Sequence, residues 1–404
     1  ANLHSHAFQR AMAGMTETRG ADTEDSFWTW RKLMYRFLDQ LNPAQVESIA
    51  AFGQMEMLES GYSSVGEFHY LHHQADGSAY DNLAEMSDRI VAAAETSGIG
   101  LTLLPVLYHL GGCDGRELAG GQRRFGNNID QYLELHGKAT AAVAEHLPDA
   151  VVGVAPHSLR AVSPESLHEV VALAAGKPVH IHIAEQIGEV DELLAHRQAR
   201  PVEWLLNNCA VDSSWCLIHA THMQPSETAS FAQTGAVAGL CPITESNLGD
   251  GIFDGVRFQQ QQGRIGVGTD SNVRISLSEE LRTLEYSQRL RDRRRAVYAD
   301  SDRSVGRLLF DSVTAGGAQA LQRHSGSLRS GAWADLLALD NTSPAFIAVE
   351  DDGWLDAWFF AADDSVVTDV WSAGRHVVTD GLHVRRDSIR QNYERTLGHL
   401  KNAL

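Results

Sequence analysis

Two histidines close to the start of the chain could bind a metal ion. They lie in the segment Asn2-Leu3-His4-Ser5-His6. Because alternate side chains of a strand point to the same face, His4 and His6 would project to one side. Two imidazoles on one face can bind one divalent ion, but such a pair can also be surface polar residues near a chain end. The pair therefore predicts half of a metal site if the rest of the chain supplies further ligands.

Further imidazoles and carboxylates follow short apolar runs later in the chain. They are His180, His182, Glu185, His219 and Asp270. His180 and His182 are two residues apart and would face the same side of a strand, so they compete for one position in a ligand set. Imidazole and carboxylate are ligands for ions such as zinc. These residues could complete the site if the fold brings their strand ends together.

The elements that must position these residues alternate between short β-rich runs and longer helical patterns. The runs are the segment before His4 and residues 62–68, 100–107, 150–155, 178–183, 215–218, 236–240 and 264–268. The helical patterns include residues 42–60, 80–97, 128–146, 164–175, 201–208 and 224–233. This alternation favours an α/β fold with a parallel sheet, and eight such units predict a closed (β/α)8 barrel of the TIM type. An open doubly wound sheet is the alternative, but no glycine-rich dinucleotide motif follows the first strand.

The pattern changes in the last third of the chain. A basic helical region is expected over residues 277–307, with its arginine run on a solvated face, and a helix of small residues over 312–321. A turn and strand follow at 326–340, then strands at 366–371 and 376–378, a turn at 381–383 and a final helix. We therefore predict a barrel over residues 1–322, a small accessory β domain over 323–386 and a C-terminal helix over 387–404.

Composition excludes some classes of partner. The formal net charge of −19 argues against nucleic-acid binding, although a few arginines can still bind an anionic small molecule. No apolar run is long enough for a membrane span, and no signal peptide is visible. The four cysteines lack a C-x-x-C pair, which is typical of reduced thiols in the cytoplasm. The sequence opens on Ala1 rather than Met, so residues before it, including a leader, stay an open question.

The candidate ligands resemble a known family once they are placed at the carboxyl ends of barrel strands, where such barrels carry their active sites. The segments HSH (4–6), HIAE (182–185), His219 and TDSN (269–272) are similar to the amidohydrolase superfamily, in its branch with one metal ion per site. Residues 326–340 and 370–374 resemble the accessory β domain of that superfamily. Members usually carry part of this domain before the His-x-His segment, and that part is absent from the sequence.

Three longer segments resemble a narrower group within the superfamily, the formimidoylglutamate deiminases of bacterial histidine degradation. They are NLHSHAFQR (2–10), GEFHYLHH (66–73) and APHSLR (155–160). The resemblance implies hydrolysis of a C–N bond in a linear amidine, which converts N-formimidoyl-L-glutamate and water into N-formyl-L-glutamate and ammonia. We also expect a homodimer.

The resemblance also implies a ligand set for the metal. His4, His6, His182 and Asp270 would hold one divalent ion, with zinc expected and iron(II) as the alternative. His182 is preferred to His180 because the H-x-x-E pattern matches there, which leaves His180 as a hydrogen-bonded histidine inside the barrel. No lysine follows the fourth strand, where relatives with two metal ions carry a carboxylated lysine.

Roles in the reaction follow from the same resemblance. Asp270 would accept a proton from the attacking water, and His219 would donate a hydrogen bond to the developing oxygen. Glu185 would carry the proton to the leaving nitrogen.

The substrate is a dicarboxylate, and planar guanidinium groups suit carboxylates best. Arg31 and Arg160 are the candidates, with Gln9, Tyr70 and His157 as neutral partners. Arg31 could instead be an ordinary helix residue, and Tyr70 a rim aromatic. His222 is expected to be structural, while no role is predicted for four other histidines: His69, His72, His73 and His109.

Two alternative functions remain at this point. The first is an aminohydrolase acting on purine-, pyrimidine- or triazine-like heterocycles, which an aromatic pocket without convergent arginines would favour. The second is a metal-binding barrel without catalysis, which the loss of Glu185, His219 or Asp270 would favour.

Overall fold

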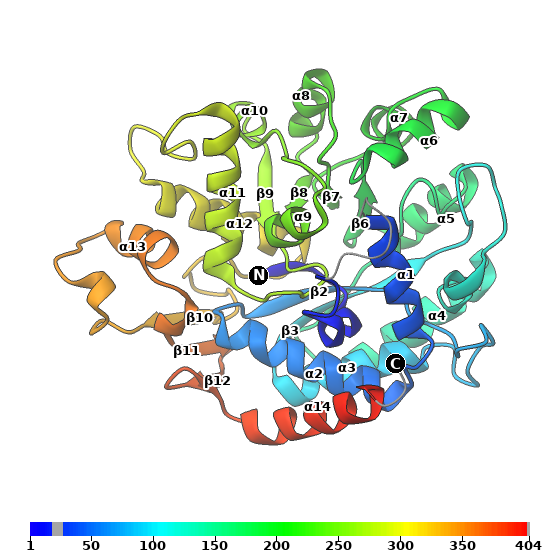
Figure 1. Cartoon of the computed structure of the whole chain (residues 1–404), viewed down its shortest axis with the longest axis horizontal. Helices are drawn as coiled ribbons and strands as arrows, with labels where there is room; N and C mark the ends of the chain where they lie inside the picture. The colour runs from blue at the N-terminus through cyan, green and yellow to red at the C-terminus, as the bar shows by residue number, and fades with distance from the viewer. Residues whose placement is uncertain (18–26, 402–404) are drawn as a thin grey trace.

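A computed structural model describes residues 1–17 and 27–401 and shows a parallel β-barrel surrounded by helices (Figure 1). All eight predicted runs form barrel strands, although the fourth is split into two short pieces. The strands are β1 (Asn2–Ser5), β2 (Ser64–His69), β3 (Gly100–Leu107), β4 (Val151–Val152) with β5 (Ala155–Pro156), β6 (Val179–Ile183), β7 (Trp215–His219), β8 (Val237–Leu240) and β9 (Arg264–Val267). The (β/α)8 prediction is confirmed.

Two isolated backbone bridges join the parallel runs β1–β5 and β6–β9 into a closed ring. Val154 pairs with Val179, and Ser5 pairs with Asp270. The second bridge requires β9 to approach β1 closely. Gly268 permits this, because a Cβ atom there would lie 2.6 Å from the backbone nitrogen of His4. The closure therefore brings the two ends of the predicted ligand set, His4 and Asp270, side by side.

Helices cover the outside of the barrel. Those of the barrel region are α1 (Phe27–Leu38), α2 (Pro43–Glu59), α3 (Glu85–Ser97), α4 (Ile129–His146), α5 (Pro164–Ala174), α6 (Ile187–Arg197), α7 (Pro201–Asn208), α8 (Pro225–Gln233), α9 (Pro242–Leu248), α10 (Gly255–Gln260), α11 (Leu277–Asp292) and α12 (Val305–Ala320), with short 3-10 helices η1 (Ala7–Met12) and η2 (Gly120–Arg124). The six predicted patterns all contain a helix. Four helices were not predicted: α1, α6, α9 and α10.

Local capping explains why α2 begins where the sequence indicated. The Asn42 side chain accepts a hydrogen bond from the Gln45 amide, and the Gln45 side chain accepts one from the Asn42 amide. Pro43 occupies the first helical position, where its missing N–H leaves no helical bond unmade.

The basic region from 277 to 307 is not one helical segment, and this expectation was wrong. Helix α11 ends at Asp292, and Arg293 adopts a left-handed backbone with φ of 54°. A left-handed residue after the last turn terminates a helix, and the arginine run falls across this end. A new helix, α12, starts at Val305, seven residues before the predicted start of the helix of small residues.

The C-terminal region contains an antiparallel sheet of four strands. They are β10 (Leu336–Leu339), β11 (Val367–Ser372), β12 (Arg375–Thr379) and β13 (Leu382–His383). The segment between β10 and β11 holds η3 (Pro344–Phe346), the unpredicted helix α13 (Gly353–Ala361) and η4 (Asp364–Val366). The final helix, α14 (Arg386–Lys401), runs beside α2 (Figure 1), where Tyr393 stacks on Phe52 at 3.8 Å between ring centroids. Residues 402–404 of the predicted helix lie outside the described residues, and the domain boundaries at 322 and 386 stay predictions.

An apolar cluster fills part of the barrel interior, beside the buried polar side chains of Thr102 and His180. Leu3, Cys216, Ile218, Val237 and Cys241 pack there with Ala320 and Leu321 of the α12 end. Such a filled interior leaves only the carboxyl ends of the strands for a site. Among the described residues, no helix is long and apolar enough to cross a membrane.

Candidate active site

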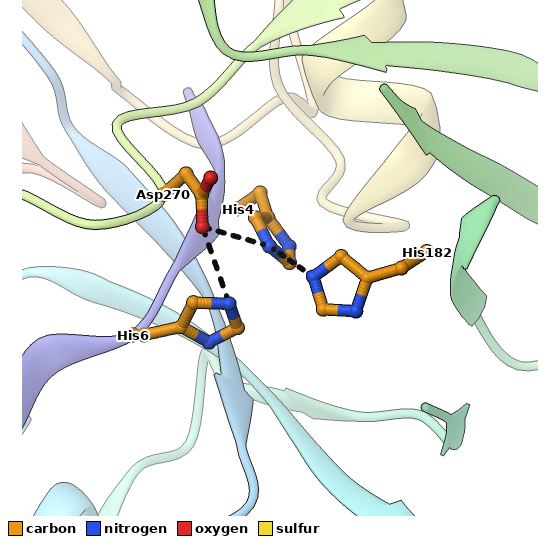
Figure 2. Close-up of side chains that lie close together, drawn as sticks. All are labelled: His4, His6, His182 and Asp270. Atoms are coloured by element: carbon orange, nitrogen blue, oxygen red, sulfur yellow. Dashed lines mark hydrogen bonds and ion pairs between the residues drawn. The ribbon is translucent and has the colours of Figure 1, made fainter. Parts of the chain in front are cut away.

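Four side chains from three parts of the barrel converge at the carboxyl ends of the strands (Figure 2). His4 and His6 come from the end of β1, His182 from β6, and Asp270 from the residues after β9. The Nε2 atom of His4 lies 3.0 Å from Nε2 of His182. Asp270 Oδ1 lies 3.5 Å from His4 Nε2 and 3.2 Å from His6 Nε2. One ligand atom from each of the four residues lies within 4.8 Å of the other three.

The second ring nitrogens of two of these histidines face backbone carbonyls. Nδ1 of His6 lies 3.0 Å from the Phe68 oxygen, and Nδ1 of His182 lies 3.1 Å from the His157 oxygen. A neutral imidazole that donates through Nδ1 keeps its lone pair on Nε2, which here points to the shared centre. Nε2 of His4 and Nε2 of His182 lie 3.0 Å apart, so both could direct a lone pair at a cation bound there. The donor set therefore fits a divalent metal.

The electrostatics of the site agree with metal-binding protonation states. Burial lowers the pKa of His4 to about 3 and that of His182 well below its ordinary value, so both rings are neutral. Burial alone would raise the pKa of Asp270, but hydrogen bonds with His4 and His6 hold it well below its usual range. Neutral imidazoles and an ionised carboxylate are the forms that bind metal.

A polar seam between β1 and β9 holds Asp270 in place. The Asp270 amide donates to the His4 carbonyl at 2.9 Å, and the His6 amide donates to the Asp270 carbonyl at 2.9 Å. On either side, Asn2 exchanges two hydrogen bonds with Thr269, and the Asn272 amide group donates to Ser5 Oγ and the His6 carbonyl. The TDSN segment is therefore fixed on the first strand by its own polar side chains.

A second cluster of charged groups lies beside the ligand set. His219 Nε2 is 3.8 Å from Asp270 Oδ2 and 3.9 Å from Glu185 Oε1, while its Nδ1 is 3.2 Å from Glu245 Oε1. Burial would lower the pKa of His219, but the carboxylates of Glu185, Glu245 and Asp270 outweigh it and raise the pKa to about 10. Burial also raises the pKa of Glu185. A carboxyl group with a raised pKa beside a protonated imidazole is suited to proton transfer.

The backbone at these strand ends is strained. Ala184, His219 and Asp270 have φ values of 50°, 67° and 47°, in the left-handed region that residues with a Cβ rarely occupy. All three stand at the ends of barrel strands. His219 and Asp270 face the shared centre themselves, and Ala184 precedes Glu185, which also faces it. Strain of this kind is typical of functional sites, where the surrounding fold holds it in place.

The predicted site residues surround one cavity. All but one of them line it, namely His6, Gln9, Arg31, Tyr70, His157, Arg160, His182, Glu185, His219 and Asp270. The exception, His4, is fully buried and lies against His182 beneath the cavity. The structure therefore brings the whole predicted set together, while the roles assigned to each residue stay predictions.

The predicted substrate-binding residues form hydrogen bonds with neutral groups of the cavity wall. Gln9 donates to the Tyr70 hydroxyl at 2.6 Å, and Arg31 donates to the Tyr108 hydroxyl at 3.1 Å. The Nε atom of Arg160 is buried, and within residues 1–17 and 27–401 it has no hydrogen-bond partner. Burial works against the charge of Arg160, but Glu189 and other anionic neighbours raise its pKa. Two guanidinium groups thus border a cavity that also contains the metal-ligand set.

Several residues of the site were not predicted from the sequence. The cavity is also lined by Trp30, Met34, Tyr35, Tyr108, Phe125, Leu248 and Ser271. Tyr108 directly follows β3, and Glu245 follows β8 on α9. Active sites of such barrels lie at the carboxyl ends of the strands. Examining the residues after the third and seventh predicted strands would therefore have identified both regions.

The remaining histidines have structural contacts. His180 lies 2.8 Å from the Ala320 carbonyl through Nε2, which confirms its predicted place as a hydrogen-bonded interior residue. His72 and His73 face the backbone oxygens of Val106 and Gly126. His109 faces the Ser166 hydroxyl.

Comparison with known proteins identifies close relatives. A family model described as the amidohydrolase family matches residues 1–377. Formimidoylglutamate deiminase of Pseudomonas aeruginosa is 52% identical, over 99% of this chain and 88% of its own length. More distantly, 5-methylthioadenosine/S-adenosylhomocysteine deaminase of Natronomonas pharaonis is 26% identical over 85% of this chain and 72% of its own length.

Solved structures give the same fold. An amidohydrolase from Brucella melitensis superposes with a TM-score of 0.95 at 47% identity, covering 99% of this chain and 88% of that one. An adenosine deaminase from Xanthomonas campestris, determined with bound zinc, has a TM-score of 0.82 at 20% identity and covers 99% and 84% of the two chains. At that identity the second likeness shows the fold alone.

Proposed function

The chain belongs to the amidohydrolase family, and we propose on that basis that it hydrolyses N-formimidoyl-L-glutamate to N-formyl-L-glutamate and ammonia. It is a hydrolase that acts on a C–N bond of a linear amidine, and the reaction belongs to histidine degradation. The 52% identity to a formimidoylglutamate deiminase supports this substrate. The observation that carries the proposal is that one cavity combines a His/Asp metal-ligand set with Arg31 and Arg160.

We infer that the cofactor is one zinc ion held by His4, His6, His182 and Asp270, with iron(II) as the alternative. The metal would lower the pKa of a bound water and so supply a nucleophile near neutral pH. Three neutral imidazoles and one carboxylate match the preferences of zinc. In the region where relatives with two metal ions carry a carboxylated lysine, this chain has His157 and Arg160 after β5, which supports a single ion.

The protein side chains divide the proton transfers among them. The ionised Asp270 accepts a proton from the attacking water while the oxygen of that water adds to the formimidoyl carbon. His219 directs Nε2 toward the same region and donates a hydrogen bond to the oxygen as charge develops on it. Glu185, whose pKa is raised by burial, delivers the proton to the terminal nitrogen. The C–N bond to that nitrogen then breaks and ammonia leaves. The hydroxyl group of the tetrahedral adduct gives its proton to Asp270 and becomes the C=O group of the formyl product, and this proton leaves with ammonia as ammonium.

The two carboxylates of the substrate require positive partners. Arg31 and Arg160 both line the cavity, and a guanidinium group can bind a carboxylate through two parallel hydrogen bonds. Tyr70 and Gln9 are already hydrogen-bonded to each other and present a neutral polar wall, with His157 beside them. The dicarboxylate form of the substrate is therefore part of the proposal.

The aromatic lining of the cavity is the one observation that favours an amino-heterocycle as substrate instead. Its aromatic side chains are Trp30, Tyr35, Tyr70, Tyr108 and Phe125. A neutral ring offers no carboxylate to the planar donors of Arg31 and Arg160, whereas the linear substrate offers two. The arginines therefore favour the linear dicarboxylate. A metal-binding barrel without catalysis is disfavoured because Glu185, His219 and Asp270 all meet at the ligand set.

Ammonia release from N-formimidoyl-L-glutamate, compared with a panel of adenine-, cytosine- and triazine-type compounds, tests the proposal. We expect turnover of the amidine and little of the heterocycles. Efficient release from a heterocycle, with none from the amidine, would contradict it.

Elemental analysis of the purified protein should give one divalent ion per chain, and a ratio near two would overturn the single-ion assignment. The expected homodimer can be tested by light scattering, and the cytoplasmic location stays a prediction.

A further inference from the structure

Among the described residues, one hydrogen bond reaches the ring of His219. Its Nδ1 atom lies 3.2 Å from Glu245 Oε1, which is within hydrogen-bond distance. On the other side, Asp270 and Glu185 are 3.8 and 3.9 Å from Nε2, which is beyond that distance. In the part of the chain that the structure describes, no other hydrogen bond to this ring is found. The orientation of the ring therefore depends on Glu245.

Glu245 is itself fixed in a rigid setting. Its Oε1 atom also accepts a hydrogen bond of 2.9 Å from the amide of Cys241, at the end of the seventh barrel strand. Its own amide donates to the Cys241 carbonyl at 2.8 Å, within the turn that starts α9. The side chain is buried, so water does not compete for the carboxylate. The Glu245 carboxylate is therefore held where it can accept the hydrogen bond of the His219 ring.

The backbone of His219 increases the need for such a partner. Both His219 and the following Ala220 are left-handed, with φ of 67° and 49°, so the strand geometry ends at the histidine itself. The ring stacks on that of His182 with centroids 5.6 Å apart, a contact that does not determine which ring nitrogen faces the metal-ligand set. A hydrogen bond to Nδ1 fixes the rotation of the ring and directs Nε2 toward Asp270 and the metal-ligand set.

We propose that Glu245 is a positioning residue for the hydrolytic reaction: it holds the His219 ring so that Nε2 faces the reacting atoms. Glu245 does not line the cavity and acts through His219. The proposal rests on the proposed function for its kinetic consequence, but the ring orientation is a property of the protein without substrate.

A nearby glutamate provides a matched control. Glu280 on α11 is also fully buried and accepts a hydrogen bond of 2.9 Å from a backbone amide of the same turn, that of Ile243. Glu280 has no contact with His219 among the described residues. Substitutions at 245 and 280 therefore disturb α9 in a comparable way, but only those at 245 remove the partner of the histidine.

Steady-state kinetics of Glu245→Leu and Glu245→Gln, beside Glu280→Leu and Glu280→Gln, test the proposal. Leucine cannot accept the Nδ1 hydrogen bond, so Glu245→Leu should lower kcat about 100-fold with little change in KM and full metal content. Glutamine keeps an acceptor oxygen, so Glu245→Gln should recover most of that loss. Both variants at 280 should keep the parental kcat. Equal losses at 245 and 280, or no difference between leucine and glutamine at 245, would overturn the proposal.

Nitrogen-15 NMR of the unmodified protein provides a test that does not depend on the activity of a variant. The His219 ring signals can be assigned by their loss in His219→Asn. We expect a hydrogen-bonded proton on Nδ1 of His219 in the absence of substrate, and a ring without one would contradict the proposal. If the parent releases no ammonia from the amidine but the Nδ1 proton is present, the proposed function fails while the positioning contact stands.

Discussion

Two clusters of charge, one buried and one partly buried, lie at opposite ends of the barrel and differ in how their charges are balanced. The reaction cluster (Glu185, His219, Glu245 and Asp270) stands at the carboxyl ends of the strands and contains three carboxylates around one imidazole. The basal network (Asp149, Arg323, Asp335 and Arg375) lies near the start of β3 and β4 and contains two carboxylates and two guanidinium groups.

The basal network satisfies its members directly. Arg323, with a side chain only 2% exposed, lies 3.1 Å from Asp149 and 2.7 Å from Asp335. Arg375 lies 2.9 Å from Asp149 and links the accessory sheet to the barrel, and the Ala373 amide donates to Asp335. The reaction cluster instead has contacts of 3.8 and 3.9 Å and left-handed backbone. Its excess negative charge suits a bound divalent cation and a cationic amidine, which arrive from outside the chain. The basal network is thus complete without a ligand, while the reaction cluster is not.

The largest effect is expected from Asp270→Asn, which removes the carboxylate shared by the reaction cluster and the ligand set. Turnover should fall by about 10³-fold or more, because both the proton acceptor and a metal ligand are lost. Metal content should fall as well. Ammonia release and elemental analysis measure the two effects, with Asp335→Asn as the control from the basal network. Parental turnover in Asp270→Asn would contradict the role of Asp270 in the reaction cluster.

His219→Ala should separate catalysis from metal binding. We expect a loss of about 10²–10³-fold in kcat, which is typical for removal of one group that stabilises the developing oxyanion. The metal should be retained, since His219 lies outside the ligand set. Near-normal turnover with normal metal content would remove His219 from the reaction cluster.

Arg323→Met should act on stability alone. Removing one member of a buried ion-pair network leaves uncompensated charge and costs about 3 kcal/mol, near the lower end of the usual range because Arg375 still faces Asp149. Urea unfolding measures the loss of stability. At urea concentrations too low to unfold the variant, its kcat should equal that of the parent. A fall in kcat without a change in stability would show that the two clusters are coupled.

Arg160→Met should weaken the transition state for the dicarboxylate without affecting the metal. Loss of a charged hydrogen-bonded pair costs about 1.5–3 kcal/mol, which would appear in kcat/KM. Arg160→Lys should recover only part of the loss, because an ammonium group cannot form the two-pronged contact. The informative control is a mono-amide analogue of the substrate. Equal kcat/KM for parent and both variants would place Arg160 outside substrate binding.

The smallest effect is the pH dependence of the basal network. Burial would raise the pKa of Asp149 and Asp335, but the hydrogen bonds and charges of Arg375 and Arg323 hold both below their ordinary value. Their contribution to stability is therefore fully present above the unfolded pKa of about 3.9 and is lost as the pH falls through the lower folded values. Urea unfolding of the parent and Asp335→Asn should differ at pH 7 and converge below pH 4. A difference that grows on acidification would contradict this sign.

The barrel could be predicted from the pattern of strands and helices, and the same pattern placed the candidate ligands at one face. The choice of His182 over His180 as a ligand came from the resemblance to the amidohydrolase superfamily, because both lie on the same side of the strand. A period of two along a strand places His4 and His6 on one face wherever the strand lies, and every parallel barrel strand ends at the same face. His182 and Asp270 could therefore be assigned to that face before the strands were assembled. The capping of α2 was equally readable, since Asn42, Pro43 and Gln45 act within one turn.

Contacts between side chains of different βα units could be seen in the three-dimensional structure but could not be predicted from the sequence. Glu245 meets His219 and Tyr108 meets Arg31 through contacts between different βα units, and no local periodicity encodes such distances. Helix α13 was missed because its apolar residues form no amphipathic pattern, and α11 ended early because Arg293 turned left-handed. Local rules fix the direction of a side chain, but the partner it meets depends on how the whole barrel closes.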